Sequence, residues 1–320
     1  MQFRRARPDR LGIPPVYTAE VAAATSSIPG LLTNSEVVAP SPASNAMMRV
    51  ERSPLVPSSP ASSGLLGLSS FSVAALPAPA LAIGYNTDLV VRLDQHPAWA
   101  SVAPLTLNAP PDDLADYVRF VSRVAERYRG RVLGYVIWNE PNLAVDWGGQ
   151  PPDPAAYTEM LCQAYAAIKR ADPRARVAAA GLAPTNQNDD QAMDDRRFLE
   201  AMLQAGAARC FDVLAAHPYG FGRPPDAPRG SYDGLVMARV EELHELLMAY
   251  GVGEKPIWAT EMGWTVDGRG GQAWQTVSEE QQAAYLADAA AIAEQRWPWL
   301  ELLTVWNLPS VDGFQGERSP

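Results

Sequence analysis

The sequence predicts an α/β protein in which a parallel sheet is covered by helices on its outer side. Two observations carry this prediction. From about residue 87 onward, short β-favouring runs alternate with amphipathic stretches, at the spacing of strand–helix–strand units. A chain of 320 residues can also bury a large core, and it fits one α/β barrel or two smaller domains.

The ordered pattern begins with the β-rich run 88–93. A helix is expected next, opened by Asp112 or Asp113 as its N-cap and closed by Gly130, because glycine readily adopts the left-handed conformation that ends helices. The run 132–138 is apolar or small throughout and is long enough for one buried strand. The pattern is therefore strand, helix, strand.

The middle of the chain continues in the same way. Asp153 is expected to cap a helix that has Pro154 at its first position, and this helix ends before Pro173. The elements expected after it are a strand at 177–181, a helix at about 196–205 and a strand at 211–215.

The last third repeats the alternation. Gly251 ends an apolar helical stripe, and Ser278 with Gln281 makes a capping box at the start of another helix. The elements expected here are a helix at 235–250, a strand at 256–260, a helix from 278 to about 294 and a strand at 302–306.

Composition narrows the classes of partner and cofactor. The formal net charge of −10 argues against nucleic acid and against an anionic membrane surface as partners. No apolar run reaches about 18 residues, so no membrane span is expected. The sequence has no P-loop, no Rossmann glycine motif and no Gly-x-Ser-x-Gly motif, and His244-Glu245 lacks the second histidine of a zinc-binding HExxH motif. We expect neither a metal nor an organic cofactor.

The two cysteines carry little sequence information. Cys162 and Cys210 form no Cys-x-x-Cys pair, and nothing suggests a disulfide framework. We interpret both as small buried hydrophobic residues.

Residues 1–84 differ from the rest of the chain. They contain eleven of the 29 prolines and no tryptophan, and they are rich in Ala and Ser, which predicts a low-complexity, irregular segment. The stretch 47–82 has a charged start, an apolar core and small residues at its end, as in a secretory signal peptide, which would make the protein secreted or cell-surface. The alternatives are a linker in a cytoplasmic protein, or a segment that the fold did not evolve with.

Polar residues of chemical interest follow the predicted strands. Asn139 and Glu140 come after 132–138, and Glu261 follows 256–260. In a parallel barrel the carboxyl ends of the strands form the face on which chemistry is done. Two carboxylates facing each other across such a rim suit glycoside hydrolysis, in which one protonates the leaving oxygen while the other attacks the anomeric carbon.

Further residues at this rim are candidate substrate contacts. Asn139 could hold a sugar hydroxyl, His217 and Tyr219 could orient Glu261, and Trp264 or Trp306 could stack on a sugar ring. The loop after the first strand adds two more candidates, His96 and Trp99. Taken singly, His217 is more often a structural histidine and Trp306 more often a core residue; their joint position at one rim favours a site.

The motifs around these residues resemble a known group of enzymes. Trp138-Asn139-Glu140-Pro141, His217-Pro218-Tyr219, the segment 259–264 (Ala-Thr-Glu-Met-Gly-Trp) and Trp306-Asn307 are similar to the retaining (β/α)8 glycoside hydrolases of the large clan that contains cellulases, β-xylosidases and β-galactosidases. The resemblance covers about residues 87–308. It implies a (β/α)8 TIM barrel over residues 85–320, a β-linked glycoside or oligosaccharide as substrate, Glu140 as acid/base and Glu261 as nucleophile.

The chain also departs from that pattern. Counted back from Glu140, the run 88–93 is barrel strand three, so strands one and two should precede residue 85, with an arginine that supports the nucleophile. Only 37–38 and 72–75 are β-like there, and little chain follows the last strand for a closing helix. We therefore expect an incomplete barrel, whose first and last strands are either exposed sheet edges or covered by loosely packed segments from residues 1–84. The alternatives are a non-catalytic or vestigial carbohydrate-binding barrel and, more distantly, another barrel hydrolase such as an amidase.

Overall fold

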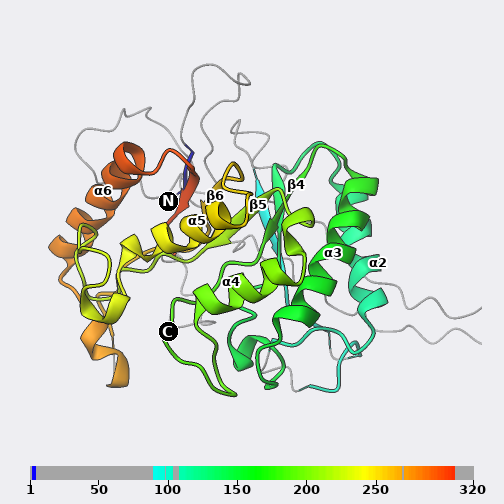
Figure 1. Cartoon of the computed structure of the whole chain (residues 1–320), viewed down its shortest axis with the longest axis horizontal. Coiled ribbons are helices and arrows are strands. Elements are labelled where there is room, and N and C mark those ends of the chain that lie inside the picture. Colours follow the sequence, from blue (N-terminus) through cyan, green and yellow to red (C-terminus); the bar gives the residue numbers. More distant parts are fainter. Residues whose placement is uncertain (1, 5–88, 98, 104–107, 269, 307–320) are drawn as a thin grey trace, which may run out of the picture.

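The computed structural model describes residues 2–4, 89–97, 99–103, 108–268 and 270–306 (Figure 1). Its strands are β1 (Gln2–Arg4), β2 (Val90–Leu93), β3 (Gly134–Ile137), β4 (Arg176–Ala179), β5 (Val213–Ala216), β6 (Ile257–Ala259) and β7 (Leu300–Thr304). Its α-helices are α2 (Leu114–Arg127), α3 (Pro154–Ala171), α4 (Asp195–Gln204), α5 (Val240–Ala249) and α6 (Glu279–Arg296). The predictions for residues 5–88, for Asn307 and for a closing helix lie outside the described residues.

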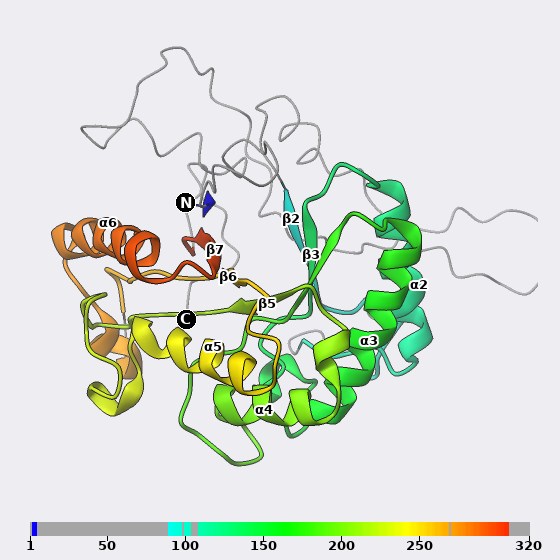
Figure 2. The same ribbon diagram turned by 45° about the horizontal axis from the view of Figure 1, so that its top comes forward.

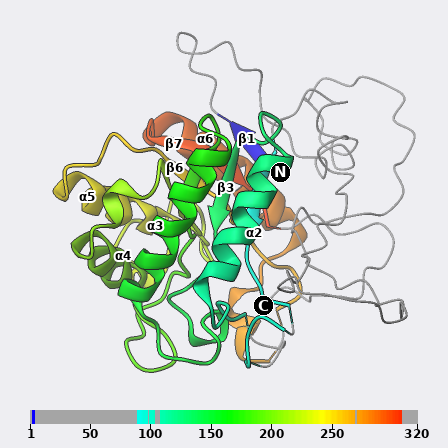
Figure 3. The same cartoon turned by 90° about the vertical axis from the view of Figure 1, so that its right-hand side faces the viewer.

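Six parallel strands form the sheet, in the order β2-β3-β4-β5-β6-β7. The sheet curls into a half-barrel, and the helices cover its outer, convex side (Figure 2). Helices α2 and α3 pack side by side against its first strands (Figure 3). This arrangement fits a partial (β/α)8 barrel, and each of these strands lies within two residues of its predicted run at both ends. The predicted alternation of strands and helices is confirmed.

A seventh strand, β1, pairs antiparallel with β7, in a register that places Gln2 opposite Thr304. The sequence predicts that the last parallel strand is either an exposed edge or is covered by a segment from the front of the chain. The structure shows the second arrangement, because β1 takes up the backbone hydrogen bonds on the free side of β7.

Local capping explains where the helices begin. The side chain of Asp113 accepts a hydrogen bond from the backbone N–H of Ala115, and Ser278 forms the predicted capping box with Gln281. Helix α5 begins at Val240 and not at the predicted residue 235, because Val236 is extended and a 3₁₀ turn precedes the helix. No helix among the described residues combines the length and apolarity needed to cross a bilayer.

The cysteines are joined, contrary to our interpretation of the sequence. Cys162 on α3 and Cys210, in the turn before β5, form a disulfide with a Cα–Cα distance of 4.7 Å and a sequence separation of 48. The two positions become neighbours only because α3 packs against the 3₁₀ turn that precedes Cys210. Sequence spacing alone contains no sign of this tertiary contact.

Candidate active site

The parallel sheet brings three strand exits to one edge. Glu140 follows β3, His217 follows β5 directly, and Glu261 follows β6. The turn after β3 has an unusual backbone, because Trp138 and Glu140 have positive φ values of 73° and 39°. The Glu140 N–H donates to the carbonyl of Gly181 after β4 at 3.0 Å, which fixes this turn against the neighbouring strand.

Asn142 stabilises the same turn through its side-chain hydrogen bonds. Its side-chain amide donates to the carbonyls of Ala183 and Met193, both at 2.9 Å, and its Oδ1 accepts from the Ala183 N–H at 2.9 Å. Asn142 is fully buried, and its two bonds with Ala183 are shielded from water. Asn142 was not predicted as a site residue, because its contacts lie 41 and 51 positions away in the chain.

The two glutamates and the histidine form one cluster. His217 Nδ1 lies 2.7 Å from Glu140 Oε1 and 3.8 Å from Glu261 Oε2. The Tyr219 hydroxyl donates to Glu261 Oε2 at 2.8 Å. One oxygen of Glu140 and one of Glu261 lie within 4.8 Å of each other. The structure therefore brings together four of the residues predicted at this rim.

The surroundings of Glu261 and His217 shift the pKa values of these two groups in opposite directions. Burial alone would raise the pKa of Glu261, but the positive charges of His217 and Arg92 and the hydrogen bond from Tyr219 outweigh burial and lower that pKa. Burial alone would lower the pKa of His217, but Glu261 and the hydrogen bond to Glu140 raise it above its ordinary value. Burial, and then the charge of Glu261, hold the pKa of Tyr219 well above its ordinary value, so the phenol keeps its proton.

Arg92 on β2 was not predicted as a site residue. Its guanidinium forms an ion pair with Glu261 Oε1, its Nε lies 3.0 Å from Asp94 Oδ2, and it lies over the Trp306 ring at 5.3 Å from the centroid. The resemblance implied an arginine beside Glu261 from an earlier strand. In the structure the arginine paired with Glu261 comes from β2. The sequence signal is a charged residue inside the buried run Val90–Leu93, where an unpaired charge would be costly.

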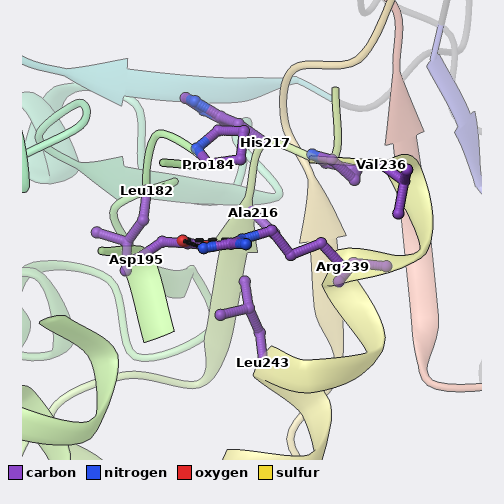
Figure 4. A pocket seen from close by; sticks show the side chains of 10 residues that line it. Leu182, Pro184, Asp195, Ala216, His217, Val236, Arg239 and Leu243 are labelled. Atoms are coloured by element: carbon purple, nitrogen blue, oxygen red, sulfur yellow. Dashed lines mark hydrogen bonds and ion pairs between the residues drawn. The ribbon is translucent and has the colours of Figure 1, made fainter. Parts of the chain in front are cut away.

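A buried layer supports His217 from behind (Figure 4). Leu182 and Leu243 line a small cavity there together with the ion pair of Arg239 and Asp195. Arg239 Nε donates to both carboxylate oxygens of Asp195, at 3.0 and 3.1 Å. Gly181 closes the other side, where an added Cβ would lie 2.2 Å from His217 Nε2. The imidazole is therefore fixed by packing as well as by its hydrogen bonds.

The other predicted rim residues differ in solvent exposure; they are Asn139, Trp306 and Trp264. Asn139 is half-buried, and its Oδ1 has no hydrogen-bond partner within the described residues. Trp306 is half-buried beside Arg92. Trp264 is 5% exposed, donates from Nε1 to the Arg223 carbonyl at 2.7 Å and packs edge-on against Tyr285. Protein contacts thus cover almost all of Trp264, and the substrate contact predicted for it stays a prediction.

His96 and Trp99 lie in the loop after β2. His96 is buried, with Nδ1 accepting from the Ala109 N–H at 3.3 Å and Nε2 lying 3.2 Å from the Ala103 carbonyl. Both ring nitrogens are thus engaged by the backbone of their own loop, and His96 holds that loop together. Trp99 is half-buried in the same loop.

Asp146 is a further carboxyl near the site that the sequence analysis missed. It lies in the 3₁₀ turn Ala144–Asp146, accepts from Asn108 Nδ2 at 3.2 Å, and its carbonyl accepts from Trp138 Nε1 at 2.7 Å. Burial, and then the charge of Glu140, raise the pKa of Asp146 to about 7.

The donor set could geometrically hold a cation, since one atom each from Glu140, His217 and Glu261 lie within 4.8 Å of one another. A metal requires a neutral imidazole, whereas these two carboxylates raise the pKa of His217. Arg92 adds a positive charge directly on Glu261. The chemistry of the cluster therefore fits a proton-sharing group better than a metal centre.

Comparison with solved structures identifies proteins that have a similar fold. A glucosidase from Croceicoccus marinus is similar over 71% of this chain and 44% of its own, with 20% identity and a TM-score of 0.53. A family 39 glycoside hydrolase from Bacteroides cellulosilyticus is similar over 67% of this chain and 42% of its own, with 18% identity and a TM-score of 0.50. The chain thus spans less than half the length of these two structures. No protein-family model and no curated protein matches it.

Proposed function

We propose that this protein is a retaining glycoside hydrolase that cleaves a β-O-glycosidic bond by double displacement, with Glu140 as acid/base and Glu261 as nucleophile. The observation that carries the proposal is the carboxylate pair at the strand exits, with oxygens within 4.8 Å. Retaining enzymes place their two carboxyl groups about 5–5.5 Å apart, whereas inverting enzymes need about 6.5–9.5 Å to admit a water molecule. The fold is one that two solved glycoside hydrolases share.

The first step requires an ionised nucleophile. Arg92 and Tyr219 both bind Glu261, and the lowered pKa of Glu261 keeps it as a carboxylate. Glu261 attacks the anomeric carbon and forms an ester bond while the glycosidic C–O bond breaks. The leaving oxygen takes a proton from Glu140.

The second step reverses the role of Glu140. Glu140 takes a proton from water, the water oxygen attacks the anomeric carbon, and the ester bond to Glu261 breaks. His217 Nδ1 lies 2.7 Å from Glu140 Oε1, and the charge of Glu261 together with this hydrogen bond raises the pKa of His217 against the effect of burial. His217 therefore lies within hydrogen-bond distance of the carboxyl group that gives up and takes back the proton in the two steps.

Activated aryl β-glycosides test the two roles. Glu261→Ala should abolish turnover with every leaving group, because no ester intermediate can form. Glu140→Ala should retain the first step with a good leaving group such as dinitrophenolate, which needs little protonation, and added azide should then accelerate the reaction by replacing the activated water. Equal loss in both variants on the activated substrate would contradict the assignment.

The alternative is a carbohydrate-binding barrel without catalysis, because the six parallel strands of the described sheet make only part of a barrel. Calorimetric binding of sugars by the wild-type protein, with no release of chromophore from any aryl β-glycoside, would favour this alternative. Chromophore release that requires Glu261 would exclude it.

A further inference from the structure

An exposed tryptophan stands on a loop at the active-site edge of the sheet. Trp274 lies in the 3₁₀ helix η6 (Gly270–Gln275), in the segment that follows β6 and Glu261, and 48% of its surface is exposed. A single exposed apolar side chain is normal, whereas one that continues into further apolar surface marks a candidate binding site. The rings around Trp274 show that continuity.

Two rings, those of Tyr219 and Phe221, lead from Glu261 to Trp274. The Tyr219 hydroxyl donates to Glu261, and the Tyr219 ring centroid lies 6.3 Å from that of Phe221. The Phe221 centroid lies 5.4 Å from that of Trp274, with only 30° between the ring planes. Phe221 is half-buried and Trp274 exposed, and at this separation and angle the two rings are offset-stacked, so Phe221 packs behind the exposed Trp274 ring. The segments after β5 (yellow) and after β6 (orange) lie side by side in Figures 1 and 2.

The backbone fixes this ring pair in place. Phe221 has a positive φ of 52°, a conformation that a bulky residue adopts only when its surroundings impose it. The next residue, Gly222, packs so closely on η6 that an added Cβ would lie 2.4 Å from the Trp274 carbonyl oxygen. On the other side, Trp264 Nε1 binds the Arg223 carbonyl at 2.7 Å. Residues 221–223 are thus held between Trp264 and η6, and the Phe221 ring packs against that of Trp274.

We propose that Phe221 and Trp274 form an aromatic platform that binds a sugar unit beyond the one cleaved at Glu261, so that the substrate is a β-linked oligosaccharide or polysaccharide. This inference rests on the proposed function. The C–H face of a pyranose is apolar and flat, and it is removed from water when it lies on an aromatic ring. The formal net charge of −10 favours neutral sugars over acidic ones.

Binding as a function of chain length tests the platform. Isothermal titration of the Glu261→Gln and Glu140→Gln proteins would use β-1,4-glucose, β-1,3-glucose and β-1,4-xylose oligosaccharides of two to six units. In at least one series the affinity should rise with chain length, and Trp274→Ala should lower the affinity for the longer members by about tenfold, the equivalent of one well-buried contact. Trp274→Phe should restore part of that affinity, because it keeps a ring.

Met248→Ala is the matched control, since Met248 is a large apolar residue, 60% exposed, on α5. It should leave the length dependence unchanged. The platform is overturned if no oligosaccharide binds, if affinity does not depend on length, or if Trp274→Ala and Met248→Ala behave alike in proteins whose thermal melts match. Because the measurement is binding, it is read separately from hydrolysis: absence of turnover contradicts the proposed function, whereas a flat length dependence contradicts the platform.

Discussion

Replacement of Arg92 by methionine tests how Glu261 is kept ionised. Arg92 pairs with Glu261 and with Asp94, and its side chain is 14% exposed, whereas those of Asp94 and Glu261 are 4% and 9% exposed. Methionine has a similar length and no charge, so the substitution leaves two buried carboxylates without their shared cation. In Arg92→Met, burial still opposes the ionisation of Glu261, and only one positive neighbour, His217, remains to favour it.

The expected magnitudes follow from this arrangement. Removal of one partner from a buried ion pair destabilises a protein by about 3–5 kcal/mol. Glu261 has a folded-state pKa below its unfolded value, so its contribution to stability is present above the unfolded pKa and is lost as pH falls through the folded pKa. The stability difference between the wild type and Arg92→Met should therefore be largest at neutral pH and shrink in acid. Loss of a preorganised charged donor should lower kcat/KM by about 10²–10³-fold.

The assays are the pH profile of kcat/KM on an aryl β-glycoside and thermal melting between pH 3 and pH 8. In Arg92→Met the acid limb of the profile should move to higher pH. Arg176→Met is the matched control, because Arg176 pairs with Glu301 and lies over Trp258, 5.0 Å from its ring centroid, at the opposite end of the strands. An unmoved acid limb in Arg92→Met, or equal effects of both substitutions, would refute the reasoning.

Three further predictions concern stability. Cys162→Ser with Cys210→Ser should cost about 4 kcal/mol, from the chain entropy of a 48-residue loop, and lower Tm by roughly 8–16 °C; two alkylated thiols in the native, non-reduced protein would contradict the disulfide. The raised pKa of Asp146, about 7, means that the folded state holds a proton that the unfolded state has lost, so stability falls as pH rises from about 4 to 7. Asp146→Asn should accordingly raise Tm at pH 8 and leave it unchanged near pH 3. The pKa of His217 is raised in the folded state, so its contribution to stability is complete below a pH of about 6.5 and is lost as pH rises through the folded-state pKa. The Tm of His217→Asn should therefore fall less between pH 6 and pH 9 than the Tm of the wild type.

Much of the fold was predictable because its signals are local. The N-caps at Asp113, Asp153 and Ser278 act within one helical turn, so the sequence around each one is sufficient to identify it. The strand exits were predictable for a related reason, since an acid directly after a buried run, as at Glu140 and Glu261, implies a position at the rim.

The residues that sequence analysis missed depend on contacts between distant segments. The disulfide joins residues 48 positions apart through helix packing. The Arg92–Glu261 pair spans 169 positions, and Phe221 meets Trp274 only where the loops after β5 and β6 touch. No local periodicity reports such contacts. Residue type alone also did not distinguish Trp264, which the loop backbone encloses, from Trp274, which it leaves exposed.

The different environments of the two glutamates follow from the topology of the sheet. Glu261 follows β6, where the neighbouring strand β5 supplies Tyr219, while the curl of the sheet brings Arg92 from β2 across the half-barrel to the same carboxylate. Glu140 follows β3, and among the described residues the side chain bonded to its carboxylate is His217. A flat sheet would keep β2 and β6 apart, because three strands separate them. Curvature therefore delivers a fixed positive charge to one carboxylate and a titratable group to the other, which is the asymmetry that an acid/base and a nucleophile require at one pH.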